Sequence, residues 1–346
     1  MEYRTLGRTG VRVSTHCLGA MMFGSLGNTD EAECAAMIHT ALDAGINFVD
    51  TADVYDRGRS EEIVGRALKG RREDVVLATK AHFEMGEGPN QRGNSRLWIM
   101  RAVEDSLTRL GTDHIDLYQM HRPEMGTDIE ETLGALDDLV HQGKIRYAGS
   151  STFPGWMLTE AHAVSERRGL VRFACEQPPY SIFVRTAERD LFPVTFRYGM
   201  GVIVWSPLAG GWLAGRYRSG RDVPADSRAT RAKDWGERIA RRFDLSRPAN
   251  QRKLELVDRL EPIADAAGLS LAHMAIAFAL AHPAVTSAII GPRTLDQLTD
   301  LLAASDVRLD AATLDAIDEV VEPGSFIEDA DRGWAEPWMT AAARRR

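Results

Sequence analysis

Short apolar runs alternate with longer amphipathic segments along most of the 346-residue chain. The runs are nearly continuous in branched apolar residues, as in 202–205, whose sequence is Val-Ile-Val-Trp. Strands of this kind are buried on both faces, which is typical of a parallel sheet covered by helices. Parallel neighbours also need a crossover connection, and the segments between the runs have the periodicity of helices. The sequence therefore predicts an α/β fold.

Eight strand–helix units can be counted from residue 17 onward. The predicted strands lie at 17–20, 46–50, 75–79, 115–120, 145–149, 171–175, 201–205 and 285–290. The predicted helices lie at 30–44, 60–69, 95–110, 128–142, 155–168, 187–198, 250–267, 270–281, 294–303 and 310–321. Eight such units without a linker between them predict one closed (β/α)8 TIM barrel with extra C-terminal helices. An open, doubly wound sheet is the alternative.

Three further segments belong to this single predicted domain, which spans residues 1–346. Alternation around glycines predicts an N-terminal β-hairpin at 3–14. Residues 216–250 lack a clear period, which indicates either a solvated loop or a lid over an anionic ligand. The basic residues of this long segment are Arg216, Arg218, Arg221, Arg228, Arg231, Lys233, Arg238, Arg241, Arg242 and Arg247. Residues 322–346, which end in three arginines, are expected to form a partly disordered tail.

The overall composition narrows the class of protein. Hydrophobic residues make up 44% of the chain and charged residues 27%, as in an ordinary globular protein with a sizeable core. A net charge of -8 argues against a nucleic-acid partner. Cys17, Cys34 and Cys175 are widely spaced, which indicates free thiols in a reducing compartment. Because no signal peptide and no apolar run of about 20 residues is visible, the expected location is the cytoplasm, away from membranes.

Ionisable side chains stand at the ends of three consecutive predicted strands. Asp50, Lys80 and His121 end or directly follow the second, third and fourth strands. Active sites of barrels lie at the carboxyl ends of the strands, and neighbouring strands are about 4.8 Å apart, so these side chains can converge. Tyr55 lies in the loop after Asp50 and can reach the same end. Each residue alone has an ordinary structural interpretation, but the combination indicates one site.

These four side chains suit proton donation to a carbonyl oxygen. A free phenol has a pKa of about 10, and a nearby ammonium lowers it. Tyr55 is therefore predicted to be the acid, and Lys80 the group that lowers its pKa. Asp50 would hold Lys80 charged, and His121 would position the substrate oxygen.

Reduction of a carbonyl group needs a hydride donor as well as a proton donor. The last predicted strand leads to a candidate anion site. Residues 289–294, Ile-Ile-Gly-Pro-Arg-Thr, place a glycine and a capped helix start after the strand. Backbone N–H groups there would be free to bind a phosphate, and Arg293 adds a fixed charge. An ordinary helix cap with a solvated arginine is the alternative. The chain has no G-x-G-x-x-G between a strand and a helix, so a Rossmann-type site is not supported.

Longer motifs make the chain resemble the aldo-keto reductases. These motifs are residues 45–55 (Gly-Ile-Asn-Phe-Val-Asp-Thr-Ala-Asp-Val-Tyr), Lys80 after its strand, residues 106–118 before His121, and residues 205–209. The chain looks most like the bacterial members grouped with aryl-alcohol dehydrogenase-like and potassium-channel β-subunit-like proteins. The resemblance implies a (β/α)8 barrel that reduces a small aldehyde or ketone with NADPH, with NADH also possible, and that needs no metal.

The resemblance also implies roles for individual residues. The implied catalytic tetrad is Asp50, Tyr55, Lys80 and His121. Ser150 and Gln177 would hold the nicotinamide carboxamide, and Trp205 would stack on the nicotinamide ring. The residues implied to hold the pyrophosphate are Ser206, Leu208, Gly210 and Arg216. Those implied to hold the adenosine phosphate are Gly291, Arg293, Thr294 and Gln297. Further implied cofactor residues are Gly19, Ala20, Met21, Asp50, Ser151, Pro207 and Asp300.

Two positions depart from the family pattern. Many relatives have Ser-Asn after the fifth strand, where this chain has Ser150-Ser151. Many also have an acid-Asn pair at the adenine, where this chain has Asp300-Leu301. These departures leave open how strongly NADPH is preferred over NADH.

Three other functions fit parts of the same pattern. A Schiff-base enzyme would use Lys80 as the nucleophile, although Asp50 nearby favours a protonated amine. A metallohydrolase would use Asp50, Asp53, His16 and His121, but the chain lacks a clustered ligand pair. A cofactor-binding redox sensor or auxiliary subunit with weak turnover is compatible with a complete tetrad. The oligomeric state is not indicated by the sequence.

Overall fold

The computed structural model describes residues 1–218, 220, 223, 227–232, 236–335, 337–339 and 343. Arg221 and Lys233 of the basic segment and the three terminal arginines lie outside the described residues. Contacts group the chain into two compact units. The first, which we call the barrel unit, comprises Met1–Gln177, Pro193–Val204 and Pro283–Asp306, and the second unit comprises Pro178–Phe192, Trp205–His282 and Val307–Arg346.

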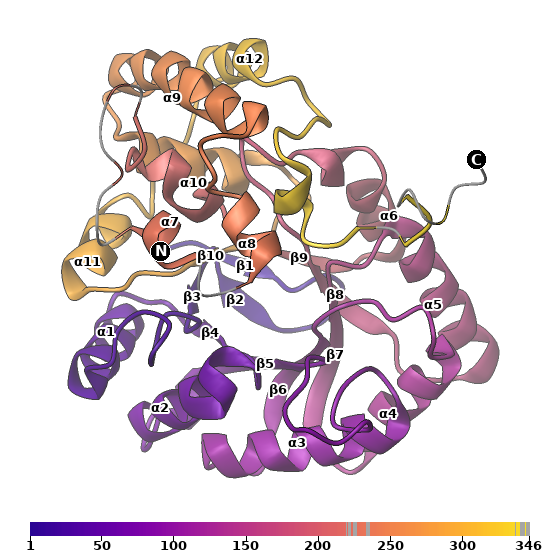
Figure 1. Cartoon of the computed structure of the whole chain (residues 1–346). Helices are drawn as coiled ribbons and strands as arrows, with labels where there is room; N and C mark the ends of the chain where they lie inside the picture. Colours follow the sequence, from indigo (N-terminus) through magenta and orange to yellow (C-terminus); the bar gives the residue numbers. More distant parts are fainter. Residues whose placement is uncertain are drawn as a thin grey trace. The chain divides into compact units, whose positions relative to one another are not determined.

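Eight parallel strands form a closed barrel within the barrel unit (Figure 1). Around the barrel their order is β10, β3, β4, β5, β6, β7, β8, β9. The strands are β3 His16–Gly19, β4 Phe48–Asp50, β5 Val76–Ala81, β6 Ile115–Met120, β7 Ile145–Ser151, β8 Phe173–Gln177, β9 Gly201–Val204 and β10 Ser287–Ile290. The predicted (β/α)8 barrel is therefore confirmed, and the open doubly wound sheet is wrong.

The helices of the barrel unit begin and end close to their predicted bounds. They are α1 Glu31–Asp43, α2 Arg59–Ala67, α3 Arg96–Leu110, α4 Ile129–His141, α5 Gly155–Arg168 and α11 Leu295–Ala303. The side chains of Asp30, Ser95 and Asp128 accept hydrogen bonds from first-turn N–H groups, so the N-termini are fixed by local capping. Gly111, at φ 62°, ends α3 in the left-handed conformation that glycine adopts without strain.

Most elements differ from the predicted ranges by one or two residues, and three of these differences are described here. β8 begins two residues later than predicted, which places Gln177 inside the strand. β5 continues to Ala81, so Lys80 lies within a strand rather than after it. The predicted helix 187–198 is divided into a 3-10 turn, η3 Thr186–Glu188, and α6 Leu191–Tyr198. Pro193 fits this start of α6, because a proline lacks an N–H and is best accommodated in the first turn of a helix.

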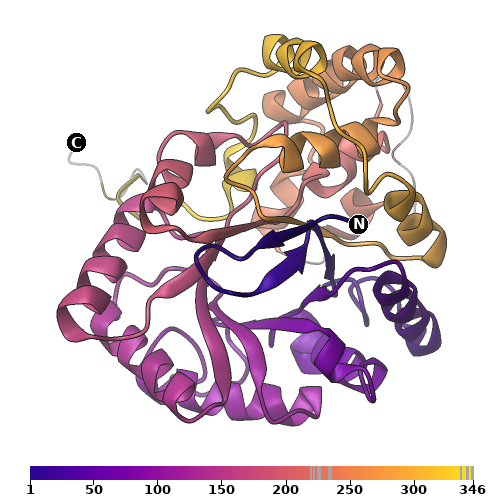
Figure 2. The ribbon, with the colours of Figure 1, turned by 180° about the vertical axis from the view of Figure 1, so that it is seen from behind.

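The predicted N-terminal hairpin is present and lies across the amino-terminal end of the barrel (Figure 2). Its strands, β1 Tyr3–Thr5 and β2 Arg12–Ser14, pair in antiparallel register. Leu6 and Val13 are fully buried in a core cluster with side chains from the barrel strands, among them Phe48. The hairpin therefore closes one end of the barrel and leaves the carboxyl ends of the strands for chemistry.

The barrel unit also contains two short 3-10 turns, η1 Tyr55–Gly58 and η2 Arg72–Asp74, and the second unit holds further helices. They are η4 Ala209–Ala214, α7 Arg228–Arg231, α8 Glu237–Arg241, α9 Pro248–Ala266, α10 Leu271–Ala281, α12 Ala311–Val320, η6 Asp329–Arg332 and η7 Pro337–Met339. The basic segment thus contains two short helices, α7 and α8. In the described part of the tail, Asp331 is buried and pairs with Lys253, at 2.6 Å, and with Arg242, at 2.5 Å. This pairing ties η6 to α9 and to the residue that follows α8.

No single helix in the described parts of the chain has the length and apolar character of a membrane span. Among the described residues, one pair of consecutive helices, α9 and α10, is long and apolar enough when taken together, and the two are bent by 86° relative to each other.

Helices α2 and α3 pack so closely that Gly65 has no room for a side chain. A Cβ there would lie 2.3 Å from the backbone oxygen of Leu110. We expect Gly65→Ala to lower the free energy of unfolding by about 1–3 kcal/mol, because backbone atoms cannot move aside cheaply. Gly134→Ala in α4 is the control, since no atom lies within 4 Å of its Cβ position. It should be neutral or stabilising by up to about 1 kcal/mol. Urea unfolding of both variants measures this, and equal midpoints would contradict the packing argument.

Candidate active site

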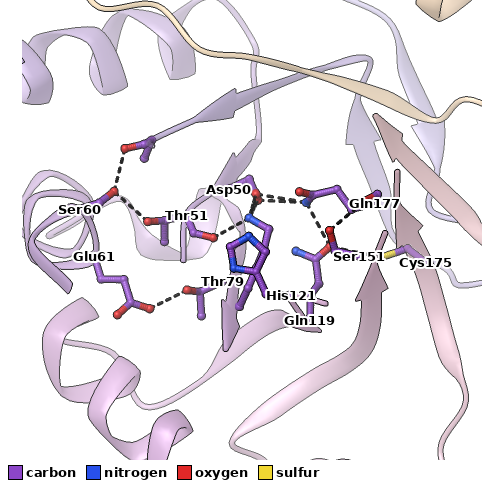
Figure 3. Close-up of polar contacts among 12 residues, drawn as sticks. Asp50, Thr51, Ser60, Glu61, Thr79, Gln119, His121, Ser151, Cys175 and Gln177 are labelled. Atoms are coloured by element: carbon purple, nitrogen blue, oxygen red, sulfur yellow. Dashed lines mark hydrogen bonds and ion pairs between the residues drawn. The ribbon is translucent and has the colours of Figure 1, made fainter. Parts of the chain in front are cut away.

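A buried ion pair between Asp50 and Lys80 lies at the carboxyl end of β4 and β5. The Lys80 ammonium donates to both carboxylate oxygens of Asp50, one of them at 2.5 Å, and to the carbonyl oxygen of Thr51 at 2.8 Å. Lys80 is fully buried and Asp50 is 2% exposed. Figure 3 shows the contacts of Asp50 with the residues around it.

Strand register explains why these two side chains meet. Asp50 is aligned with Ala78 across the parallel pair β4–β5. Lys80 lies two residues beyond Ala78, and side chains two residues apart point to the same face of a strand. Both polar side chains therefore enter the barrel interior at its carboxyl end. A one-residue shift of β5 would turn Lys80 away from the interior.

Tyr55 is carried over the ion pair by a tight turn, η1 Tyr55–Gly58. Asp56 and Arg57 adopt φ values of 49° and 53°, an uncommon backbone conformation for residues other than glycine. The Asp56 carboxylate accepts from the Ser25 backbone N–H at 2.8 Å and also from the Ser25 hydroxyl, which holds the turn. The Lys80 nitrogen lies 5.1 Å from the centroid of the half-buried Tyr55 ring.

His121 completes the group from the end of β6. Its ring lies edge-on to Tyr55, with centroids 5.7 Å apart, and edge-on to Phe83 at 4.9 Å. Its backbone N–H donates to Ala81 at 3.0 Å. Burial, followed by the charges of Arg122 and Lys80, holds the pKa of His121 well below its usual value. The imidazole is therefore neutral near pH 7. The structure thus brings all four predicted tetrad residues together.

The electrostatics of the ion pair keep Lys80 charged. Burial lowers the pKa of Lys80, but the Asp50 carboxylate and Tyr55 outweigh burial and raise it above its usual value. For Tyr55 the balance differs from our expectation. Burial raises its pKa, and the Lys80 charge offsets only part of that increase. Tyr55 is therefore a neutral phenol that retains its proton.

Gln177 connects the ion pair to the predicted carboxamide site. Its amide nitrogen donates to both oxygens of Asp50 and to the side-chain oxygen of Gln119, each at 3.2 Å (Figure 3). These contacts fix the orientation of the amide and leave the Gln177 oxygen for another partner. Ser151 donates its hydroxyl to the backbone oxygen of Gln177 at 2.9 Å. Ser150 contacts Glu176 at 2.5 Å.

At the predicted anion site at the start of α11, side-chain oxygens of the protein accept hydrogen bonds from the backbone N–H groups. The Arg293 N–H donates to the side chain of Gln297 at 2.9 Å, and the Leu295 N–H donates to Glu33 at 3.2 Å. The Thr294 hydroxyl oxygen accepts from the Gln297 N–H at 3.3 Å and so caps the helix. The expectation of free N–H groups is therefore wrong for these three positions, because protein oxygens already accept from them. The half-buried Arg293 side chain remains the positive group of this loop.

The other predicted cofactor residues of the barrel unit lie near the ends of β3 and β10. Gly19 is aligned with Asp50 across β3–β4, and the Ala20 N–H donates to the Asp50 backbone oxygen at 2.8 Å. Met21 is half-buried. Gly291 directly follows β10, and Asp300 lies in α11. Both residues are exposed.

The remaining predicted cofactor residues follow β9 in the second unit. They are Trp205, Ser206, Pro207, Leu208, Gly210 and Arg216. Trp205 is held by backbone hydrogen bonds to Pro178, at 3.0 Å, and Tyr180, at 3.3 Å. Ser206 has φ 57° and Gly210 has φ 75°, so the backbone turns sharply after Trp205.

Three residues that lie beside predicted cofactor residues were not themselves predicted to belong to the site. Arg242 lies 5.9 Å from the Trp205 ring, and Arg228 lies beside the Cβ position of Gly210. Both belong to the basic segment, which gave no period from which to place them. Glu176 lies buried in β8 beside Gln177. Its signal was a carboxylate between the apolar residues 173–175 and Gln177.

Gln177 and Ser150, both predicted to hold a carboxamide, are arranged differently. The Gln177 amide is oriented by Asp50 and Gln119 and has its oxygen left to accept a hydrogen bond. The Ser150 hydroxyl contacts Glu176 and the Cys175 backbone oxygen, on the opposite face of the sheet from Gln177. Within the described residues, no group of three or more His, Cys, Asp or Glu side chains is arranged to hold a metal ion.

Comparison with known proteins identifies the family. The family model described as "Aldo/keto reductase family" matches residues 17–322. The uncharacterized oxidoreductase YrpG of Bacillus subtilis (strain 168) is 41% identical over 342 residues, which cover 95% of this chain and 99% of that protein. A probable voltage-gated potassium channel subunit beta from Oryza sativa subsp. japonica is 39% identical, covering 93% and 97% of the two chains. Versiconal hemiacetal acetate reductase of Aspergillus parasiticus is 35% identical, covering 93% and 98%.

The chain therefore belongs to the aldo/keto reductase family. Membership supports an oxidoreductase that acts generally in carbonyl reduction, and the family generally uses NAD(P)H.

Removing one partner of the ion pair should destabilise the protein strongly. We expect Asp50→Asn to lower the free energy of unfolding by about 3–5 kcal/mol, because a buried ammonium loses its counter-charge. The double variant Asp50→Leu, Lys80→Met removes both charges and should recover much of that loss. Chemical unfolding of the single and double variants measures both effects. A double variant less stable than Asp50→Asn would contradict this account.

Proposed function

We propose that the protein reduces a small aldehyde or ketone to an alcohol with NADPH, and that Tyr55 donates the proton. The observation that carries the proposal is the buried Asp50–Lys80 pair, with Tyr55 and His121 packed around it. Family membership supports carbonyl reduction in general. The proposal adds the nucleotide, the proton donor and the cytoplasm as location, which the three free, buried cysteines favour.

The charges of the site explain how Tyr55 can act as an acid. Near pH 7 its phenol is protonated, so the proton is present before reaction. When the proton leaves, the Lys80 ammonium stabilises the phenolate. Asp50 keeps Lys80 charged and in place. A neutral His121 can donate one N–H to the carbonyl oxygen without adding a second positive charge beside Lys80.

The residues implied by the family resemblance would bind the dinucleotide. Gln177 would hold the carboxamide, and Trp205 with the loop after it would hold the ring and the pyrophosphate. Bound NADPH would supply the hydride. Arg293 would recognise the phosphate that distinguishes NADPH from NADH, because a guanidinium suits phosphate oxygens. The engaged N–H groups of α11 make Arg293 the principal candidate for this role.

A second candidate function is a cofactor-binding redox sensor or auxiliary subunit with weak turnover. The observation in its favour is the name of the rice relative, a probable potassium channel subunit. An intact tetrad is compatible with this function as well. Measured turnover of simple carbonyl compounds by the wild type distinguishes the two.

A Schiff-base mechanism is disfavoured by the ion pair. The raised pKa of Lys80 keeps its amine protonated, whereas a nucleophilic lysine needs a lowered pKa. Borohydride treatment with a carbonyl substrate should therefore leave Lys80 unlabelled.

Replacement of Tyr55 tests the proton donor directly. Tyr55→Phe should lower kcat for reduction by about 100-fold or more, because general-acid catalysis contributes at least that much. NADPH binding, measured by tryptophan fluorescence quenching, should remain nearly unchanged. Tyr147→Phe, a tyrosine on β7 close to the hairpin end, is the control and should retain activity. Turnover retained in Tyr55→Phe would refute this mechanism.

Replacement of Arg293 tests nucleotide preference. Arg293→Ala should weaken NADPH binding by about ten- to 100-fold, since a charge-assisted hydrogen bond contributes about 1.5–3 kcal/mol. NADH binding should change little, because NADH lacks the extra phosphate. Parallel fluorescence titrations with both nucleotides measure the ratio of the two affinities. Equal affinities in the wild type, or equal losses in the variant, would exclude this role for Arg293.

A further inference from the structure

Arg122 is a half-buried cation directly after the tetrad residue His121, in the loop that follows β6. Its guanidinium carbon lies over the Phe83 ring, 5.4 Å from the centroid, and that ring lies edge-on to His121, with centroids 4.9 Å apart. The His121 ring in turn lies edge-on to Tyr55 at 5.7 Å. The four side chains therefore form a continuous row that begins at the predicted proton donor and ends in a positive charge.

Local contacts fix the position of Arg122. Pro123 follows it, and a residue before a proline favours an extended backbone. The Arg122 backbone oxygen accepts from the Asn94 side-chain amide at 2.9 Å. Its guanidinium donates to the His121 backbone oxygen at 2.5 Å, and its place over the Phe83 ring adds a cation–π attraction. Because the charge is held in advance, a ligand that pairs with it does not bear the full cost of ordering a long side chain.

The charge of Arg122 acts on the reacting end of the row. Burial is the largest cause of the low pKa of His121, and the Arg122 charge is the next. Burial also raises the pKa of Tyr55, and the charges of Lys80 and Arg122 act in the opposite direction. The guanidinium therefore belongs to the same end of the barrel as the predicted proton donor.

A carboxylate is the group that suits Arg122 best. A guanidinium carries five N–H donors in a planar fork that can bind both oxygens of a carboxylate, and the contact with His121 uses one of them. The carboxylate nearest to Arg122 in the sequence, Glu124, accepts from the Asn94 N–H at 2.6 Å and from the Thr127 hydroxyl at 2.7 Å. These contacts direct Glu124 to the neighbouring loop backbone.

We propose that Arg122 is a specificity-determining residue that binds a carboxylate on the carbonyl substrate, so that the protein prefers aldehydes or ketones with an anionic substituent. This inference rests on the proposed function, since it places the carbonyl oxygen at Tyr55 and His121. A substrate bound there extends along the row past Phe83, and its carboxylate pairs with the guanidinium. A neutral substrate of nearly the same shape gives up that pairing, which is how the site distinguishes the two.

The test compares the NADPH-dependent reduction of 4-carboxybenzaldehyde and of its neutral ester, methyl 4-formylbenzoate. The measured quantity is the ratio of kcat/KM for the acid to kcat/KM for the ester. This ratio cancels every effect of a substitution that is common to both aldehydes, including effects on Tyr55 and His121. Arg122→Gln should lower the ratio by about five- to 20-fold, less than for a fully buried pair because the side chain is only half-buried. Arg122→Lys keeps the charge without the fork, and its ratio should fall between the two.

Arg96→Gln is the matched control. Arg96 is an exposed arginine at the start of α3 that pairs with Asp138, and its replacement removes the same charge from the chain. The ratio should stay close to that of the wild type, because distant exposed charges are screened. An equal fall of the ratio in Arg96→Gln and Arg122→Gln would overturn the inference.

Salt gives a measurement on the wild type, which decides the matter if Arg122→Gln does not fold. Raising the ionic strength to about 0.5 M should lower the ratio of acid to ester, because salt screens a half-buried ion pair. A ratio that salt leaves unchanged would overturn the inference.

Binding measured without turnover separates this inference from the proposed function. The probe is 4-(hydroxymethyl)benzoate, the alcohol formed from the acid, titrated calorimetrically in the presence of NADP+. It should bind the wild type about five- to 20-fold more tightly than Arg122→Gln. Equal Kd values, or a ratio of acid to ester that Arg122→Gln leaves unchanged, would overturn the inference. A difference in Kd without reduction of either aldehyde would instead refute the proposed function and leave the carboxylate site in place.

Discussion

The buried ion pair between Asp50 and Lys80 is the interaction on which the rest of the candidate site depends. An ammonium with no exposed surface is tolerated only with a counter-charge and well-placed hydrogen bonds, and Asp50 and the Thr51 carbonyl supply both. The parallel register of β4 and β5 brings the two groups together. The Asp50–Lys80 contact therefore matters both for stability and for the candidate site. If the barrel closed in another register, Lys80 would be buried without its counter-charge.

Much of this arrangement could be predicted from the sequence. The alternation of buried strands and amphipathic helices indicated a barrel, and the order of Asp50, Lys80 and His121 along the chain placed them on neighbouring strands. Strand ends were less predictable, because local patterns do not show how far a ladder extends. Lys80 and Gln177 lie within strands that were predicted to end before them.

Individual hydrogen bonds between segments far apart in the sequence could not be predicted. The Leu295 N–H is taken by Glu33, which lies 262 residues earlier in the chain, so no local signal could show that this helix start is occupied. The pKa of Tyr55 is a similar case. The sequence showed a lysine able to lower it, but the larger opposing effect of burial appears only when the surrounding residues are in place.

Asp50 contacts both Lys80, which was predicted to belong to the catalytic tetrad, and Gln177, which was predicted to bind the cofactor. One carboxylate holds the Lys80 ammonium, and the same two oxygens accept from the Gln177 amide. Because an amide that donates through its nitrogen must present its oxygen elsewhere, Asp50 fixes the direction in which Gln177 can accept a hydrogen bond. A change at Asp50 therefore acts on both sides at once: it alters the charge beside Tyr55 and the orientation of Gln177. In the proposed function Asp50 therefore serves more than proton transfer, and its loss should affect cofactor positioning and proton transfer together.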